Sequence, residues 1–131
     1  MSEIKLGIIG GGQLGSMLSN AAQKLNVKTV IYCDDLDAPA KKFCDEFIFG
    51  KYDEKEKINE FIEKVDIATY EFENIPFETL NEINKTKPVL PKPSINRLIQ
   101  HRLAEKDFVN KLNIRTTQYA SVDKKSDLDS L

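Results

Sequence analysis

The sequence predicts an α/β protein built on an open, parallel β-sheet with helices on both faces. An apolar run, Ile4–Ile9, leads into the glycine-rich stretch Gly10–Gly15, and an amphipathic run then continues to about Leu25. Strands of a parallel sheet are apolar on both faces, whereas helices carry one apolar stripe. Apolar segments and helical patterns alternate along the rest of the chain, which is typical of parallel strands joined by crossover helices.

The run after the glycines is expected to be a helix that packs on the sheet. Its apolar residues recur at the spacing of one helical face and are predicted to be core residues: Leu14, Met17, Leu18, Ala21 and Leu25. Asn26 suits the end of this helix, because asparagine tolerates the left-handed conformation that often follows a last turn. Val27–Cys33 is rich in β-branched residues and is predicted to be the second strand.

The remaining elements follow in the same alternation. We first expect a short helix at 38–43, a third strand at 47–49, and a helix that opens with Asp53 and Glu56 as a capping box. A fourth strand at 66–70, a helix after Pro76 and a fifth strand at 88–90 should follow. The chain should then be helical from the N-cap Ser94 to about 112, with a break near His101, and should form a last strand at 116–122.

Five such strands suggest a Rossmann-like sheet in the order 3-2-1-4-5. In that order the first and fourth strands are neighbours, and a crevice opens at their carboxyl ends. The glycine stretch would line this crevice together with Glu71 and Glu73, which directly follow the fourth strand. Two carboxylates separated by one residue point to the same side if strand geometry continues. They could then accept hydrogen bonds from the hydroxyls or amine of a ligand.

Composition excludes several classes of function. The net charge of −2 gives no electrostatic reason to expect nucleic acid as a partner. No apolar run approaches the ~20 residues of a membrane span, and the N-terminal residues do not resemble a signal peptide. The two cysteines, Cys33 and Cys44, form neither a disulfide framework nor a zinc-site pattern. These features suggest a cytoplasmic protein with reduced thiols.

Asp34 indicates a competing interpretation. It follows the second strand about 20 residues after the glycine stretch, where a dinucleotide-binding domain carries the acid that binds a ribose. An NAD-binding oxidoreductase domain is therefore an alternative, and a non-catalytic binding or assembly module is another. His101, the only histidine, has no partner at a recognisable catalytic spacing, and Arg97 and Arg102 belong to the same helical stretch.

Four segments taken together are more specific than any one of them: 7–15 with its Gly-Gly-Gly-Gln-Leu-Gly run, Asp45-Glu46-Phe47, 69–76 with its Tyr-Glu-Phe-Glu-Asn run, and 102–106. Together they resemble the N-terminal domain of 5-(carboxyamino)imidazole ribonucleotide synthases, ATP-grasp enzymes of purine biosynthesis. The resemblance extends over essentially the whole chain. It implies a pre-ATP-grasp domain at residues 1–113, with 114–131 as the start of the following ATP-grasp region.

The resemblance also implies an activity and a set of site residues. These ligases carboxylate 5-aminoimidazole ribonucleotide with bicarbonate while ATP is cleaved to ADP and phosphate. By position, the residues expected to bind the ribonucleotide are Gly12, Gln13, Leu14, Glu71, Glu73 and Asn74. Arg102 matches a position expected to touch ATP.

ATP and magnesium would be bound mainly by regions beyond residue 131, so no catalytic residue and no metal ligand is expected in this stretch, which should be inactive alone. A homodimer is also implied. Three positions depart from the family pattern: Ser16 replaces a frequent basic residue, His101 replaces an aspartate, and Asn113 replaces a glycine.

Overall fold

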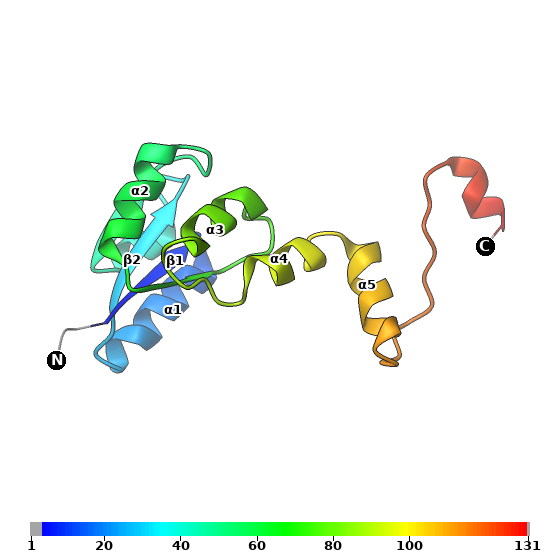
Figure 1. Cartoon of the computed structure of the whole chain (residues 1–131), viewed down its shortest axis with the longest axis horizontal. Coiled ribbons are helices and arrows are strands. Elements are labelled where there is room, and N and C mark those ends of the chain that lie inside the picture. The colour runs from blue at the N-terminus through cyan, green and yellow to red at the C-terminus, as the bar shows by residue number, and fades with distance from the viewer. Residues whose placement is uncertain (1–3, 131) are drawn as a thin grey trace. The chain divides into compact units, whose positions relative to one another are not determined.

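A computed structural model describes residues 4–130 of the chain (Figure 1). These residues divide into two compact units, one ending at Asn96 and one beginning at Arg97. The elements of the first unit are β1 (Lys5–Ile9), α1 (Gln13–Lys24), β2 (Lys28–Cys33), the 3-10 helix η1 (Pro39–Lys42), β3 (Glu46–Phe49), α2 (Lys55–Lys64), β4 (Ile67–Tyr70) and α3 (Phe77–Asn84). Helix α4 (Pro93–Ile99) contains the division, and α5 (Arg102–Lys111) and the 3-10 helix η2 (Lys125–Ser130) belong to the second unit. No helix within residues 4–130 has the length and apolar character needed to cross a membrane.

The first unit contains a four-stranded, parallel sheet in the order β3-β2-β1-β4. Ile9, the last residue of β1, is level with Tyr32 on β2 and Tyr70 on β4, so these three strands end at one edge. The predicted order of the first four strands is confirmed. The predicted fifth strand is not formed within residues 4–130, because the chain makes only one isolated parallel bridge there, between Ala68 and Val89.

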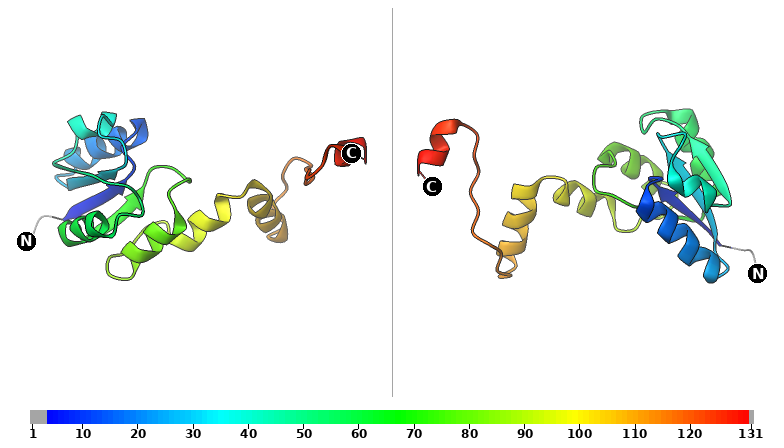
Figure 2. Two further views of the ribbon diagram at one scale, coloured as in Figure 1. Left: turned by 90° about the horizontal axis from the view of Figure 1, so that it is seen from above. Right: turned by 180° about the vertical axis from the view of Figure 1, so that it is seen from behind.

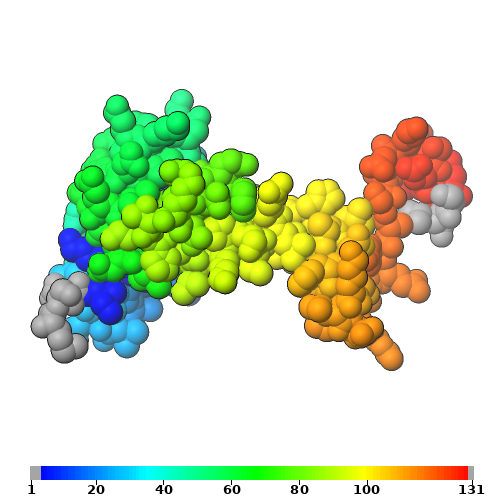
Figure 3. Space-filling model, viewed as in Figure 1, coloured from blue at the N-terminus to red at the C-terminus, as the bar shows by residue number. Residues whose placement is uncertain are grey.

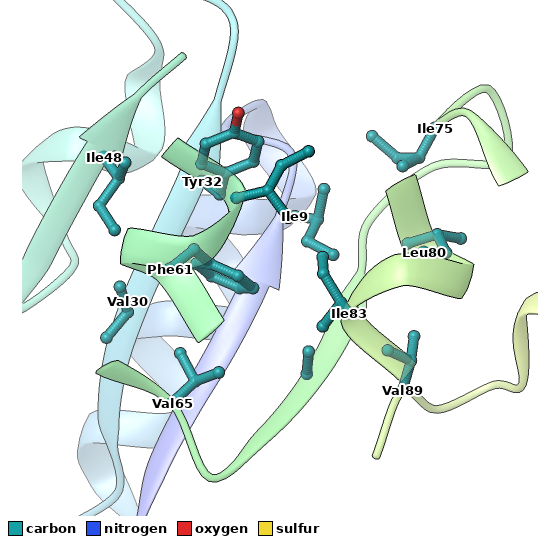
Figure 4. Close-up of a cluster of buried hydrophobic side chains, with 12 residues drawn as sticks. Ile9, Val30, Tyr32, Ile48, Phe61, Val65, Ile75, Leu80, Ile83 and Val89 are labelled. Atoms are coloured by element: carbon teal, nitrogen blue, oxygen red, sulfur yellow. The ribbon is translucent and has the colours of Figure 1, made fainter. Parts of the chain in front are cut away.

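Helices cover both faces of this sheet, as predicted. One face packs against α2 and α3 through a cluster of large apolar side chains, which includes Phe61, Leu80 and Ile83 (Figure 4). The other face carries a smaller cluster around Ile8 and Ile31. Helix α1 lies on that second side, opposite the green helices in the left view of Figure 2. The core is therefore divided into a thick layer and a thin layer.

The prediction of which face of α1 packs against the sheet is wrong. The residues of α1 that are buried are small: Gly15, Ser19 and Ala22. The predicted core residues are instead exposed, with 55% of Leu14, 60% of Met17, 37% of Leu18 and 75% of Leu25 accessible and Ala21 also exposed. Helix α1 lies so close to the glycine stretch that a Cβ atom at Gly15 would be 2.9 Å from the carbonyl oxygen of Gly10. Only small side chains fit at that separation.

Two of the predicted helix ends are confirmed and two helix starts are wrong. Asn26 has a φ of 57° after α1, as its left-handed tolerance predicts. His101 separates α4 from α5 as the N-cap of α5. Helix α2 is not capped by Asp53, because residues 51–54 form a turn in which the Glu54 N–H donates to Lys51 O at 3.0 Å. Helix α4 begins at Pro93, one residue before the predicted cap.

The second unit lacks the predicted strand at 116–122. That segment is extended but has no strand partner within residues 97–130. Side chains of α5 hold it instead: Tyr119 donates to Asp107 Oδ1 at 2.6 Å, and Asn110 Nδ2 donates to Thr116 Oγ1 at 3.0 Å. A run with strand propensity forms a strand only where a neighbouring backbone completes its hydrogen bonds. The predicted domain boundary at residue 113 stays a prediction, and the division between the two compact units falls after Asn96.

Candidate functional site

The candidate site lies at the carboxyl ends of β1, β2 and β4, where the glycine stretch turns from strand into helix. Gly10 has a φ of 105°, a conformation that side-chain-bearing residues rarely adopt. Its N–H donates to Tyr32 O at 2.8 Å, and Gly11 O accepts the N–H of Ala40 at 2.9 Å. The loop is thus anchored to β2 and η1. The first turn of α1 therefore lies at the edge of the sheet where proteins of this fold class bind their ligands.

The carboxylate of Glu71 fills the turn of this loop. Glu71 Oε1 accepts the backbone N–H of Gly12 at 2.7 Å, and Oε2 accepts that of Gly15 at 2.5 Å. Gly12 is the N-cap of α1 and provides no side-chain cap of its own. The first amides of a helix need acceptors, and they favour negative charge. Glu71, which follows Gly12 by 59 positions in the sequence, supplies both the acceptors and the negative charge.

The positions around Glu71 require glycine, because the Glu71 side chain lies too close to leave room for a Cβ atom. A Cβ atom at Gly12 would lie 2.8 Å from Glu71 Oε1, and one at Gly15 would lie 3.1 Å from Oε2. A Cβ atom at Gly10 would collide with Glu71 Cγ. The three glycines of the fingerprint therefore surround the chain's own carboxylate. The Gly12 and Gly15 amides, which an anionic ligand could otherwise contact, are thus satisfied from within the protein.

A cavity of about 190 Å³ opens beside this carboxylate. Its walls come from the end of β2, from the segments that follow all four strands, and from η1: Gly11, Gly12, Cys33, Asp34, Asp35, Ala38, Pro39, Tyr52, Glu71 and Phe72. The glycine stretch and Glu71 therefore line one cavity, as the predicted strand order implies, and Asp34 lines it as well. Phe72 adds an aromatic side chain to the cavity wall and also packs against the core cluster, whereas Tyr70 packs against that cluster without lining the cavity.

The charge of this cavity comes from carboxylates. Burial raises the pKa of the Cys33 thiol. Burial, followed by the negative charges that Cys33 and Asp34 can carry, raises the pKa of Tyr52. Both groups therefore keep their protons at neutral pH and act as weak donors. A neutral or cationic group with hydroxyl or amine hydrogens matches such a surface better than a phosphate does.

The other predicted ribonucleotide-binding residues lie near the cavity in sequence but outside its lining. Gln13 and Leu14 are exposed at the start of α1. Glu73 and Asn74 are exposed in the turn that follows β4. The expectation that Glu71 and Glu73 point to the same side fails in its premise, because strand geometry ends at Tyr70. Glu71 alone of the two carboxylates reaches the glycine stretch.

Arg102 belongs to the second unit. Its side chain is 77% exposed and forms an ion pair with Glu105, with 2.6 Å between Nη1 and Oε2. His101 Nδ1 accepts the N–H of Ala104 at 3.4 Å, so the histidine has a capping role. Within residues 4–130, no three side chains of His, Cys, Asp or Glu gather in a way that could hold a metal ion.

A larger groove of about 660 Å³ lies between α2 and α3, whose outer surfaces are green and yellow-green in Figure 3. It is lined by charges of both signs, among them Asp53, Lys55, Glu78 and Lys85. Mixed charges of this kind are typical of a solvated surface. The smaller cavity is the better candidate, because parallel α/β sheets bind ligands beyond the carboxyl ends of their strands.

Among the cavity-wall residues that sequence reasoning missed are Cys33 and Tyr52. Cys33 is the last residue of β2 and could have been found, since residues at strand ends face the crevice. Tyr52 follows β3 through Gly50 and a turn, and no sequence pattern indicates that its ring returns to the cavity.

Comparison with known proteins gives a consistent set of relatives. A sequence family described as "Ribonucleotide synthetase preATP-grasp domain" matches residues 3–100. The chain is 36% identical over 124 residues to an N5-carboxyaminoimidazole ribonucleotide synthase of Staphylococcus aureus, covering 95% of this chain and 33% of that protein. It is 39% identical over 125 residues to the bifunctional purine synthesis protein purC/E of Dictyostelium discoideum, covering 95% of this chain and 12% of that protein. The chain thus spans about a third or less of the length of these relatives.

Solved structures agree with these relatives. The N5-carboxyaminoimidazole synthetase of Staphylococcus aureus complexed with ADP superimposes with a TM-score of 0.89 at 34% identity, covering 98% of this chain and 35% of that one. The synthase of Aspergillus clavatus in complex with ADP and 5-aminoimidazole ribonucleotide superimposes with a TM-score of 0.84 at 26% identity, again covering 98% and 35%. The similarity includes both units of the present chain.

Proposed function

The chain belongs to the ribonucleotide synthetase preATP-grasp domain family, and we propose that it is the N-terminal part of an ATP-dependent ligase of purine biosynthesis. The observation that carries this proposal is the 36% identity to an N5-carboxyaminoimidazole ribonucleotide synthase across 95% of the chain. That synthase is about three times as long as this chain, so the complete activity needs residues outside this chain.

The proposed reaction joins 5-aminoimidazole ribonucleotide and bicarbonate while ATP is cleaved to ADP and phosphate. Phosphorylation of bicarbonate gives carboxyphosphate, and the amine of the ribonucleotide then attacks the activated carbon. Such an attack needs the amine held neutral and close to that carbon. The present chain would contribute one wall that binds and orients the ribonucleotide.

The residues proposed for this wall are Gly12, Gln13, Leu14, Glu71, Glu73 and Asn74. Each oxygen of the Glu71 carboxylate accepts one backbone N–H, and each retains a second lone pair. Glu71 also lines the cavity, so those lone pairs can accept from a hydroxyl or an amine. Gln13 is exposed at the start of α1, and Glu73 and Asn74 are exposed in the turn after β4, so these side chains can add donors and acceptors once substrate is bound.

ATP is proposed as the cosubstrate, because a related structure is a complex with ADP. Arg102 is proposed to approach ATP, where a guanidinium can stabilise charge on transferred phosphate. Magnesium would accompany ATP and be held by regions beyond residue 131. A homodimer in the cytoplasm is part of the same proposal and rests on the family resemblance.

The dinucleotide alternative has one observation in its favour. Asp34 lines the same cavity as Gly11 and Gly12, as a ribose-binding acid would. The position of Glu71 opposes it, because a pyrophosphate would need the amides that Glu71 already holds. The ligase is therefore the better supported function.

Steady-state kinetics of the full-length protein test the proposal. Glu73→Ala should raise KM for aminoimidazole ribonucleotide by about 10-fold or more, the effect of losing a charge-assisted hydrogen bond. KM for ATP should change little. Asp66→Ala is a matched control, since its carboxylate accepts the Lys5 N–H at 2.8 Å at the opposite end of the sheet. Unchanged ribonucleotide kinetics would remove Glu73 from the site, and micromolar NAD binding without ribonucleotide-dependent ADP formation would overturn the proposed function.

A further inference from the structure

We propose that Glu71 is a built-in anion that closes the glycine stretch to phosphate, and that this residue determines which end of a ligand the loop accepts. A glycine-rich turn at a helix N-terminus ordinarily presents free amides to a phosphate. Here the amides of Gly12 and Gly15 already donate to the oxygens of Glu71, at 2.7 and 2.5 Å.

The glycines themselves show that the loop is shaped around this side chain. Cβ atoms at Gly12 and Gly15 would come within 2.8 and 3.1 Å of its oxygens, and one at Gly10 would overlap its Cγ. The space that a phosphate oxygen would need beside the amides is therefore filled by Glu71. A dinucleotide could enter only by displacing that side chain and leaving its charge without these two donors.

The rest of the cavity strengthens the exclusion. Asp34 and Asp35 line it beside Glu71, and none of the lining residues within 4–130 is Lys or Arg. A phosphate that entered would meet carboxylates at close range without a cation to balance it, which is unfavourable in a partly enclosed site. Hydroxyl and amine hydrogens, in contrast, find acceptors in the carboxylates of Asp34, Asp35 and Glu71.

This reasoning deepens the proposed function and, for the following step, rests on it. A ribonucleotide has a phosphate at one end and a ring with an amine at the other. The loop would face the hydroxyls and the amine, and the phosphate would point away toward residues outside this cavity. The exclusion of phosphate by Glu71 stands on geometry alone and can be tested without any measurement of activity.

Selective ¹⁵N-glycine labelling makes the test direct, because the chain has six glycines. Amide resonances of Gly12 and Gly15 are followed while inorganic phosphate, and separately NAD, is added to the full chain. In the wild type, neither ligand should shift them. In Glu71→Ala, phosphate should produce a saturable shift at both glycines, since the vacated amides regain the character of an anion site.

Two further variants complete the design. Glu71→Gln keeps the side-chain volume but replaces one acceptor oxygen by a donor. It should show the same phosphate-induced shift, though a weaker one, and it provides the test if Glu71→Ala does not fold. Asp34→Ala removes a carboxylate from the same cavity and should show no response. The proposal is overturned if the wild type responds, if folded Glu71 variants do not respond, or if Asp34→Ala responds as Glu71→Ala does. None of these outcomes depends on ligase activity, so they are independent of the proposed function.

Discussion

The carboxylate of Asp45 accepts the backbone N–H of Thr29, with 2.9 Å between Oδ2 and N. Thr29 is fully buried near the start of β2, and Asp45 directly precedes β3. In return, the Asp45 N–H donates to Thr29 O at 3.1 Å. Lys28 Nζ lies 3.1 Å from the other carboxylate oxygen. One side chain thus fixes the register at which β2 and β3 begin to pair.

This arrangement predicts how stability depends on pH. The hydrogen bond from Thr29, with the charge of Lys28, holds the pKa of Asp45 below its ordinary value. A carboxylate with a lowered folded-state pKa contributes stability above its unfolded pKa, which is near 3.9. That contribution is lost as the pH falls through the folded pKa. The free energy of unfolding of the wild type should therefore fall on acidification below about pH 4 more steeply than that of Asp45→Asn.

Urea unfolding at a series of pH values measures this difference. Asp37→Asn is the matched control, since Asp37 is exposed and the described structure shows no hydrogen bond to its carboxylate. The control should keep the acid-dependent loss of the wild type. Parallel pH profiles for the wild type and Asp45→Asn would show that Asp45 is not the linked group.

The packing of α1 leads to a second prediction. Ala22 is 6% exposed on the face toward the sheet, whereas Met17 is 60% exposed on the other side. Ala22→Leu adds carbon atoms to a tightly packed layer and should lower the free energy of unfolding by about 1–3 kcal/mol. Met17→Gln, a substitution between residues of similar helix propensity, should change it by less than about 0.5 kcal/mol. Chemical denaturation of the two variants distinguishes the faces, and an equal loss in both would restore the apolar stripe as core.

The first four strands and their order could be predicted from the sequence, because each strand is a short apolar run and each crossover carries helical periodicity. Asn26 was also predictable, since few residues tolerate its left-handed conformation. The buried face of α1 was not. Periodicity separates apolar from polar sides, but here the small residues Gly15, Ser19 and Ala22 are buried instead, because the helix approaches the loop so closely.

The candidate site was predictable in its place and not in its chemistry. Strand order brings Glu71 near the glycine stretch, as expected. That the carboxylate would take the place of a phosphate depends on a contact across 59 residues, for which no local pattern exists. The prediction of a strand at 116–122 failed for a different reason. Its residues favour a strand, but no neighbouring strand is present within the described part of the chain.

The N-cap of α5 gives the last prediction. His101 Nδ1 accepts the N–H of Ala104 at 3.4 Å, which is long for a capping bond. Aspartate is a stronger N-cap and also places negative charge at the positive end of the helix. His101→Asp should therefore stabilise the first turn of α5 by about 0.5–1 kcal/mol, and His101→Asn should give the capping part of that gain without the charge.

Amide hydrogen exchange at Ala104 reports this local stability, because the amide exchanges when the first turn opens. Its protection should rise in the order His101→Ala, wild type, His101→Asn, His101→Asp. Added salt should reduce the difference between the Asn and Asp variants, since the helix-dipole contribution is screened while the neutral hydrogen bond is not. If His101→Ala leaves the exchange of Ala104 unchanged, the histidine does not cap the helix in solution, and the aspartate variant would then owe any gain to charge alone.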